Sequence, residues 1–266
     1  MVEYVTLNNG VQMPILGYGT YQIPSNITER CVTDALNAGY RSIDTAQCYG
    51  NEREVGAACR RSGISRTELF ITTKLWACHD YQDTLRSIDS SLKKLDMKYI
   101  DLLLIHEPTG DVHEIYRAIE TAYKEGKLRA VGISNFLEDR YLDLLNHCSV
   151  VPAVNQVETH VFRQQKKLIQ LECKAGTKHE SWSPLACGKN GIFSNRVLAA
   201  IAEKHGRTIA QVALRFLIQQ GIIVIPKSTH LERMKENFEA LGFDLGADEM
   251  SAIERLEVGS SLFGWW

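Results

Sequence analysis

Short apolar runs alternate along the chain with longer segments in which apolar residues recur every three or four positions. Such alternation predicts strands and helices in turn. A run such as Leu102–Ile105, apolar throughout, is typical of a parallel strand buried on both faces. The expected strands are Ile15–Gly19, Arg41–Asp44, Leu69–Lys74, Ile100–His106, Ala130–Ser134, Ala153–Glu158, a weaker one at Lys178–Trp182, and Ile222–Pro226.

The segments between these runs have helical periodicity. Leu85, Ile88, Leu92 and Leu95 form one apolar stripe, and Thr208–Gln211 is a capping-box sequence that opens another helix. Glycines stand where helices are expected to end before the next strand, at Gly39, Gly126 and Gly221.

Eight strand–helix units in 266 residues predict a (β/α)8 barrel that forms a single domain over residues 1–266. Tyr4–Leu7 and Val11–Pro14 flank a tight-turn sequence, so a short N-terminal β-hairpin is expected before the barrel. The alternative is a doubly wound open sheet. Its usual G-x-G-x-x-G turn is absent, since Gly17 and Gly19 are followed by Gln22 at the third glycine position.

The composition of the chain excludes several classes of function. A net charge of −2 gives no reason to expect nucleic acid or an anionic membrane as partner. No run is long and apolar enough for a membrane helix, and the N-terminus does not resemble a signal peptide. The seven cysteines include no C-x-x-C pair, so neither a metal site nor a redox motif is indicated. Reduced thiols and a cytoplasmic location are expected.

Polar residues stand at the ends of most of the expected strands, where barrel enzymes carry their chemistry. Asp44, Lys74 and His106 end three successive strands, and Tyr49 follows Asp44 in the next loop. An ammonium lowers the pKa of a nearby phenol, and a carboxylate keeps that ammonium charged. We therefore expect Tyr49 to act as a proton donor beside Lys74 and Asp44, with His106 orienting a substrate carbonyl. The alternative for each residue alone is a structural role in the barrel.

A second polar group follows the last expected strand. Lys227, Ser228 and Arg233 stand where barrels often bind phosphate, and Arg233 offers a bidentate fork. Alternatively, these residues belong to a solvent-exposed helix face that binds no ligand.

In seven segments that include these polar residues, the chain resembles the aldo-keto reductases. The matching sequences are Gly39–Ala46 with Tyr49–Glu52, Ile71–Trp76, Tyr99–His106, Val131–Phe136, Val154–Glu158, Trp182–Leu185 and Ile225–Ser228. The resemblance implies NADPH/NADP+ as cofactor and a catalytic tetrad of Asp44, Tyr49, Lys74 and His106. The cofactor-binding residues that it implies are Ser134, Asn135, Gln156, Trp182, Ser183, Leu185, Lys227, Ser228, Arg233, Glu236 and Asn237.

The chain departs from the family pattern in three places. Glu107 stands where the family usually has tryptophan, and the seventh strand is polar over Gly176–Glu180, so we expect it to be short or distorted. The short tail Leu262–Trp266 can close over the pocket, pack on the barrel or form a contact patch, and simple packing is favoured. Tyr21, Trp76 and Cys78 are expected near the substrate, Trp76 foremost.

The sequence thus predicts an NADPH-dependent oxidoreductase that reduces aldehydes or ketones, is expected to be a monomer and binds only small molecules. Two alternatives stay open: a cofactor-binding barrel with a structural or regulatory role, and a hydrolase or isomerase on the same fold.

Overall fold

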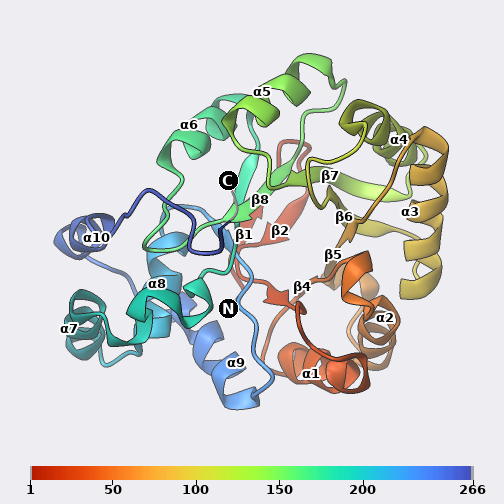
Figure 1. Cartoon of the computed structure of the whole chain (residues 1–266). Helices are drawn as coiled ribbons and strands as arrows, with labels where there is room; N and C mark the ends of the chain where they lie inside the picture. The colour runs from red at the N-terminus through yellow and green to blue at the C-terminus, as the bar shows by residue number, and fades with distance from the viewer. Residues whose placement is uncertain (1, 265–266) are drawn as a thin grey trace.

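The computed structural model describes residues 2–264, and its centre is a sheet of eight parallel strands ringed by helices (Figure 1). In spatial order the strands are β10 (Ile223–Val224), β9 (Lys178–Trp182), β8 (Val154–Glu158), β7 (Leu128–Ser134), β6 (Ile100–Ile105), β5 (Phe70–Leu75), β4 (Ser42–Asp44) and β3 (Tyr18–Gly19). The helices are α1 (Ser25–Asn37), α2 (Glu52–Arg61), α3 (Tyr81–Leu95), α4 (Val112–Lys124), α5 (Glu138–His147), α6 (Lys166–Ala175), α7 (Arg196–His205), α8 (Ile209–Ile218), α9 (Leu231–Phe238) and α10 (Ala247–Glu254).

Backbone hydrogen bonds join the first strand to the last and close the sheet into a barrel. Leu16 forms a parallel bridge with Val224, and Gly17 N–H donates to the Val224 carbonyl at 2.9 Å. Gly19 N–H donates to the Pro226 carbonyl at 3.2 Å. The predicted (β/α)8 barrel is confirmed, and the open-sheet alternative is wrong.

The two closing strands are only two residues long each, shorter than the sequence predicts. A β-carbon on Gly19 would stand 2.8 Å from the Ile225 carbonyl oxygen. The barrel therefore closes by a close approach of two backbones that only glycine permits.

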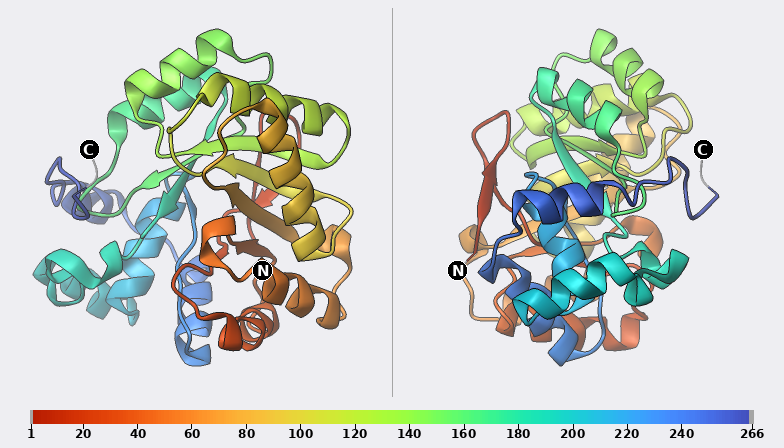
Figure 2. Two further views of the ribbon diagram at one scale, coloured as in Figure 1. Left: turned by 45° about the vertical axis from the view of Figure 1, so that its right-hand side comes forward. Right: turned by 90° about the vertical axis from the view of Figure 1, so that its left-hand side faces the viewer.

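The predicted hairpin is present and fills the N-terminal end of the barrel. Strand β1 (Tyr4–Thr6) pairs antiparallel with β2 (Gln12–Pro14). Leu7 and Met13 are buried in one apolar cluster with Phe70, Leu102, Leu104, Ala130, Ala153, Val154 and Ile223. Figure 2 shows the hairpin at one end of the barrel and the C-terminal tail at the other. The polar site must therefore lie at the tail end.

Strand β9 is not distorted, contrary to the expectation from its polar sequence. It pairs regularly with β8 from Lys178 to Trp182. His179 is buried, with Nδ1 2.6 Å from Glu172 and Nε2 2.7 Å from Thr159 Oγ1. Ser181 donates to the Thr159 carbonyl. His179 and Ser181 are tolerated in this buried strand because neighbouring segments supply their partners.

The helices bury the stripes that their sequences indicate. Ile88 and Leu95 are fully buried in α3, and Thr208 and Gln211 form the predicted capping box of α8. Gly39, Gly126 and Gly221 each follow the end of a helix, as predicted, and each has a positive φ. Within residues 2–264 no helix combines the length and the hydropathy that crossing a membrane requires.

Candidate active site

A cavity of about 730 Å³ opens at the C-terminal ends of the strands. Most of the predicted site residues line it, namely Tyr21, Asp44, Tyr49, Trp76, His106, Ser134, Asn135, Gln156, Trp182, Ser183, Leu185 and Lys227, whereas Lys74, Ser228, Arg233, Glu236 and Asn237 do not. Parallel strands bring these residues together because their carboxyl ends share one rim.

The floor of the cavity is an ion pair buried in the barrel. The Lys74 ammonium nitrogen lies 2.5 Å from Asp44 Oδ1 and also donates to the Thr45 carbonyl at 3.2 Å. Both side chains are almost completely buried. Lys74 is also 3.3 Å from the Tyr49 hydroxyl, so one ammonium connects the carboxylate to the phenol.

The pKa of Tyr49 differs from the expectation, which was that the Lys74 ammonium would lower it. Burial raises the pKa of Tyr49 to about 12, and the opposing effect of Lys74 does not overcome it. The expected net lowering is therefore wrong, and the phenol holds its proton firmly. Burial alone would lower the pKa of Lys74, but Asp44 and Tyr49 raise it above its ordinary value. Lys74 thus remains a cation although it is buried.

His106 stands at the rim beside Tyr49, with ring centroids 5.7 Å apart, and Trp76 packs edge-on against its other side. Burial, with the nearby Lys74 charge, lowers the pKa of His106 to about 3. The imidazole is therefore neutral near pH 7 and has one N–H to donate. Its Nδ1 lies 3.5 Å from the Cys48 thiol.

Glu107 joins the site through Asn135. Asn135 donates to Glu107 Oε1 at 2.8 Å and to the His106 carbonyl at 3.2 Å, and its Oδ1 accepts from the Trp182 indole at 2.8 Å. Glu107 Oε2 is buried without a hydrogen bond among the described residues. Burial raises the pKa of Glu107 to about 7 although Asn135 lowers it.

A second buried carboxyl, Glu180, lies next to Gln156 in the β8–β9 register. Gln156 donates to Asp44 Oδ2 at 3.0 Å. Neither Glu180 oxygen has a hydrogen bond of ordinary geometry within the described chain, although the Gln156 amide lies near enough to lower its pKa. Burial, followed by the Asp44 charge, raises the pKa of Glu180 well above its usual range. The ion pair thus lies beside a carboxyl that favours its neutral form.

The residues expected at a cofactor phosphate lie at and beyond one edge of the cavity. Lys227 and Arg233 are exposed, and neither forms an ion pair or hydrogen bond within residues 2–264. Ser228 is buried, and its Oγ accepts from the His230 N–H at the start of α9. Asn237 is buried in α9, and the Glu236 carboxylate accepts from Thr208 at 2.8 Å.

The loop after β9 has an unusual backbone. Ser183, Ala186, Cys187 and Asn190 all have positive φ, a conformation that costs free energy outside glycine. Strain of this kind is often found where a loop is shaped for a ligand.

The C-terminal tail forms a wall of the cavity. Phe263 packs edge-on against Trp182 at 5.2 Å, and Lys189 donates to the Leu262 carbonyl at 2.8 Å. Leu262 packs on the barrel core, whereas Phe263 lines the cavity. Simple packing, the favoured expectation, therefore holds only for Leu262. Trp265 and Trp266 lie outside the described residues.

Of the three expected substrate contacts, Tyr21 and Trp76 are exposed at the cavity. The Tyr21 ring lies 5.0 Å from that of Tyr49. Cys78 is buried and lines a separate, smaller cavity instead.

Sequence reasoning missed several residues of the site. Glu180 could have been found, because it stands two positions before Trp182 in a strand and so faces the same side. Cys48 directly precedes Tyr49. Lys189 carried no signal, because the conformation of a loop leaves no periodic pattern, whereas Phe263 belongs to the tail for which closure over the pocket was one of three predicted alternatives.

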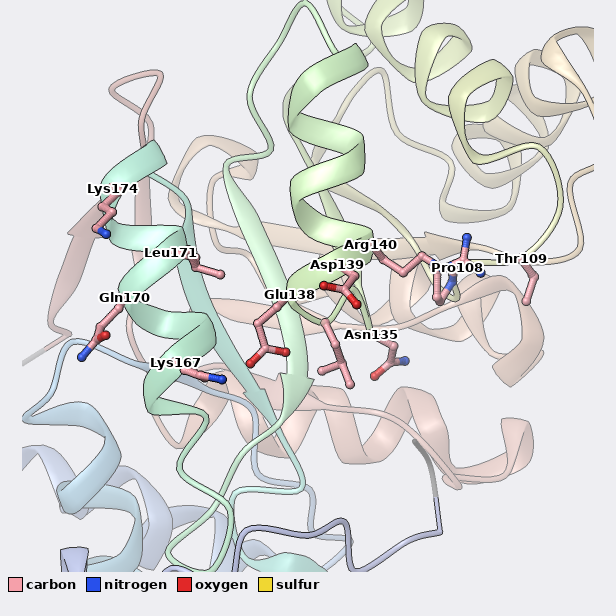
Figure 3. Close-up of a pocket in the computed structure, with 11 residues that line it drawn as sticks. Pro108, Thr109, Asn135, Glu138, Asp139, Arg140, Lys167, Gln170, Leu171 and Lys174 are labelled. Atoms are coloured by element: carbon pink, nitrogen blue, oxygen red, sulfur yellow. The ribbon is translucent and has the colours of Figure 1, made fainter.

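A larger cavity of about 890 Å³ lies outside the barrel mouth, between the start of α5 and the side of α6 (Figure 3). Glu138 from α5 and Lys167 from α6 point toward each other across it, and Asp139, Arg140 and Lys174 also line it. It shares Asn135 with the site but contains none of Asp44, Tyr49, Lys74 and His106.

Comparisons with known proteins agree with this geometry. The model of the aldo/keto reductase family matches residues 15–258. An aldo-keto reductase of Mycolicibacterium smegmatis is 41% identical, with 98% of this chain and 96% of the relative covered. The glyoxal reductase of Bacillus subtilis is 43% identical, with coverages of 96% and 92%, and the methylglyoxal reductase DkgA of Yersinia pestis is 39% identical, with 98% and 95%.

Among solved structures, an aldo-keto reductase from a deep-sea metagenome library superposes with a TM-score of 0.95 at 43% identity, over 97% of each chain. This agreement extends over the barrel and nearly the whole length of the chain. The protein therefore belongs to the aldo/keto reductase family and is an oxidoreductase of carbonyl compounds.

Proposed function

We propose that the protein reduces aldehydes and ketones to alcohols with NADPH, and that Tyr49 is the general acid. The observation that supports this most directly is the contact of the Tyr49 hydroxyl with Lys74, which is paired with Asp44 inside the barrel. Hydride addition to a carbonyl leaves an alkoxide that needs one proton. Tyr49 is a protonated donor at the cavity, held beside a fixed positive charge.

Each member of the tetrad has a distinct role in this proposal. The Tyr49 hydroxyl donates its proton to the carbonyl oxygen as negative charge develops there. Lys74 stabilises the phenolate that remains, and Asp44 holds Lys74 charged and in place. His106, neutral near pH 7, donates a hydrogen bond to the same oxygen and orients the carbonyl.

The cavity fits a nicotinamide cofactor. Trp182 offers a ring fixed through its indole N–H, and Gln156 and Ser134 offer polar groups beside it for a carboxamide. Lys227 and Arg233 have no ion pair within residues 2–264 and lie where a 2′-phosphate is expected, whereas the neighbouring Lys235 is paired with Glu232. This contrast favours NADPH over NADH. When bound, the reduced nicotinamide supplies the hydride.

The Glu236 carboxylate is already engaged by Thr208, and so we propose it only as a boundary of the adenine site. Ser183, Leu185, Ser228 and Asn237 complete the proposed cofactor site. Tyr21 and Trp76 are proposed to contact the substrate. Because the relatives include enzymes named glyoxal and methylglyoxal reductase, small dicarbonyl compounds are the first substrates to test.

The proposal is tested by Tyr49→Phe. The variant should lose about 10²- to 10⁴-fold in kcat, the usual contribution of a general acid, because phenylalanine has no proton to donate. Oxidation of NADPH is followed by absorbance with a panel of aldehydes and ketones, in parallel with NADH. The wild type should use NADPH better than NADH.

Cofactor binding provides the control, since Tyr49→Phe should still quench its fluorescence on addition of NADPH. Tyr4→Phe, a change of the same kind at an exposed tyrosine of the hairpin, should keep full activity. Undiminished turnover by Tyr49→Phe would contradict the role of Tyr49. Cofactor binding without turnover in the wild type would instead favour a non-catalytic barrel.

A further inference from the structure

Two histidines and an aspartate meet on the outer surface of the barrel, between α4 and α5. His113 lies in the first turn of α4, and Asp143 and His147 lie one turn apart in α5. One possible ligand atom from each residue lies within 4.8 Å of those of the other two. None of the three lines the cavity at the barrel mouth.

Each oxygen of the Asp143 carboxylate lies near one of the two imidazoles. His113 Nε2 is 3.2 Å from Asp143 Oδ2, and His147 Nδ1 is 3.7 Å from Asp143 Oδ1. Bonds of about 2.0–2.1 Å to nitrogen and 2.0–2.2 Å to oxygen place the ligands of a tetrahedral Zn²⁺ about 3.3 Å apart. The distance between His113 and Asp143 already matches this spacing, and His147 can offer its Nε2, because its Nδ1 contacts the Asp143 main-chain carbonyl.

The backbone helps to hold this arrangement. His147 Nδ1 is 2.7 Å from the Asp143 carbonyl oxygen, one helical turn earlier. Metal-binding histidines are commonly oriented by such a contact through the ring nitrogen that does not bind the metal. The α5 helix therefore presents a carboxylate and an oriented imidazole together.

The charges favour a cation at this point. Within residues 2–264, the ion pairs of Asp143 are those with His113 and His147. The centroids of the two imidazole rings lie 4.5 Å apart, so both rings stand close to the one carboxylate. A divalent ion bound by the three groups would compensate the charge of that carboxylate.

There is also room for the water molecules that would complete the coordination. A cavity of about 400 Å³ adjoins the cluster and is lined by His113 and Asp143, with Asp111 and Arg140 as further charged groups. Three protein ligands with remaining positions open to water are a common arrangement for zinc.

We propose that His113, Asp143 and His147 form a binding site for a divalent transition-metal ion of the zinc class, which links α4 to α5. Imidazole ligands suit Zn²⁺, Cu²⁺ and Ni²⁺, whereas Mg²⁺ and Ca²⁺ prefer oxygen ligands throughout. This metal-site proposal does not depend on the proposed reductase activity, so a negative result for one leaves the other unaffected.

The test is calorimetric titration of the metal-free protein with ZnCl2 at about pH 7.5. Wild-type protein should bind one equivalent more than His113→Ala or His147→Ala, and Asp143→Asn should weaken that equivalent by more than about tenfold. His79→Ala, which removes another exposed histidine, is the matched control and should bind as the wild type does. Mg²⁺ should give no corresponding heat.

A second readout separates this site from binding by cysteines such as Cys48. In histidine-labelled protein, Co²⁺ should shift the ring signals of His113 and His147 but leave that of His79 unchanged. Lowering the pH to about 5 should weaken the binding at least about tenfold, because protons compete for the imidazoles. Equal Zn²⁺ stoichiometry in the wild type and in a His113→Ala/His147→Ala double variant would overturn the proposal.

Discussion

At the scale of single residues, burial sets the protonation of most of the titratable groups at the site, whereas Lys74 keeps its charge through Asp44 and Tyr49. Burial keeps the Tyr49 proton in place and His106 neutral, and it also acts on two carboxyl groups, Glu107 and Glu180. Sequence reasoning predicted which of these groups converge but not their protonation. It judged Tyr49 from its neighbouring charge and could not weigh that charge against the depth of burial.

Glu107 is expected to make stability depend on pH near neutrality. Burial raises its pKa to about 7 in the folded protein, above the usual value of about 4.3 for glutamate. A raised carboxyl pKa favours the folded state fully at low pH, and that advantage is lost as the pH rises through about 7.

Glu107→Gln retains an acceptor for Asn135 but cannot ionise. Its Tm relative to wild type should therefore increase from about pH 5 to about pH 8, as measured by thermal unfolding in matched buffers. A difference in Tm that is the same at both pH values would show that Glu107 titrates normally.

At the scale of elements, the sequence predicted the strands and their order well, because a parallel barrel repeats one pattern of burial. The prediction was wrong about the regularity of β9, because the polar residues of this strand indicated a short or distorted one. The reason lies in contacts across units: His179 is satisfied by Glu172 and Thr159, which precede it in the chain. Such partners cannot be recognised from the periodicity of a strand alone.

The packing of α2 against the end of α3 depends on Gly56. A β-carbon at this position would lie 2.1 Å from the Leu95 carbonyl oxygen, which also accepts from Arg60 at 2.6 Å. We expect Gly56→Ala to lower the free energy of unfolding by about 1–3 kcal/mol or more, because the two helices must separate.

Urea denaturation measures this effect, with Gly242→Ala as the control. The β-carbon at Gly242 would meet only a guanidinium nitrogen at 3.9 Å, so its cost should stay below about 1 kcal/mol. Equal stabilities of the two variants would mean that α2 can shift freely on α3.

At the scale of the whole molecule, segments distant in sequence build one wall of the active site. The C-terminal tail supplies Phe263, which packs against Trp182 at the end of a strand, and the loop after β9 supplies Lys189, which lies over the Phe263 ring. The sequence could place Trp182 because a strand ends there. It gave no indication of Lys189 and could not choose among three positions for the tail, because loop and tail conformations do not follow from a repeating pattern.

Phe263→Ala tests whether this wall supports the proposed cofactor. Loss of one aromatic contact should weaken NADPH binding about twofold to tenfold, since Trp182 loses the ring packed against it. Fluorescence titration measures the Kd, and Val258→Ala, an exposed change earlier in the tail, is the control. An unchanged Kd for Phe263→Ala would exclude the tail from the cofactor site.

The closure of the barrel by Leu16 and Val224 also has a consequence for biosynthesis. A ribosome makes the first of these residues early and the second near the end, so one edge of the growing sheet stays unpaired through most of translation. The finished fold therefore cannot form progressively behind the ribosome. A nascent chain that stalls before Val224 leaves an open edge that can pair with other chains, and in the cell this makes the last fifth of the chain decisive for avoiding aggregation.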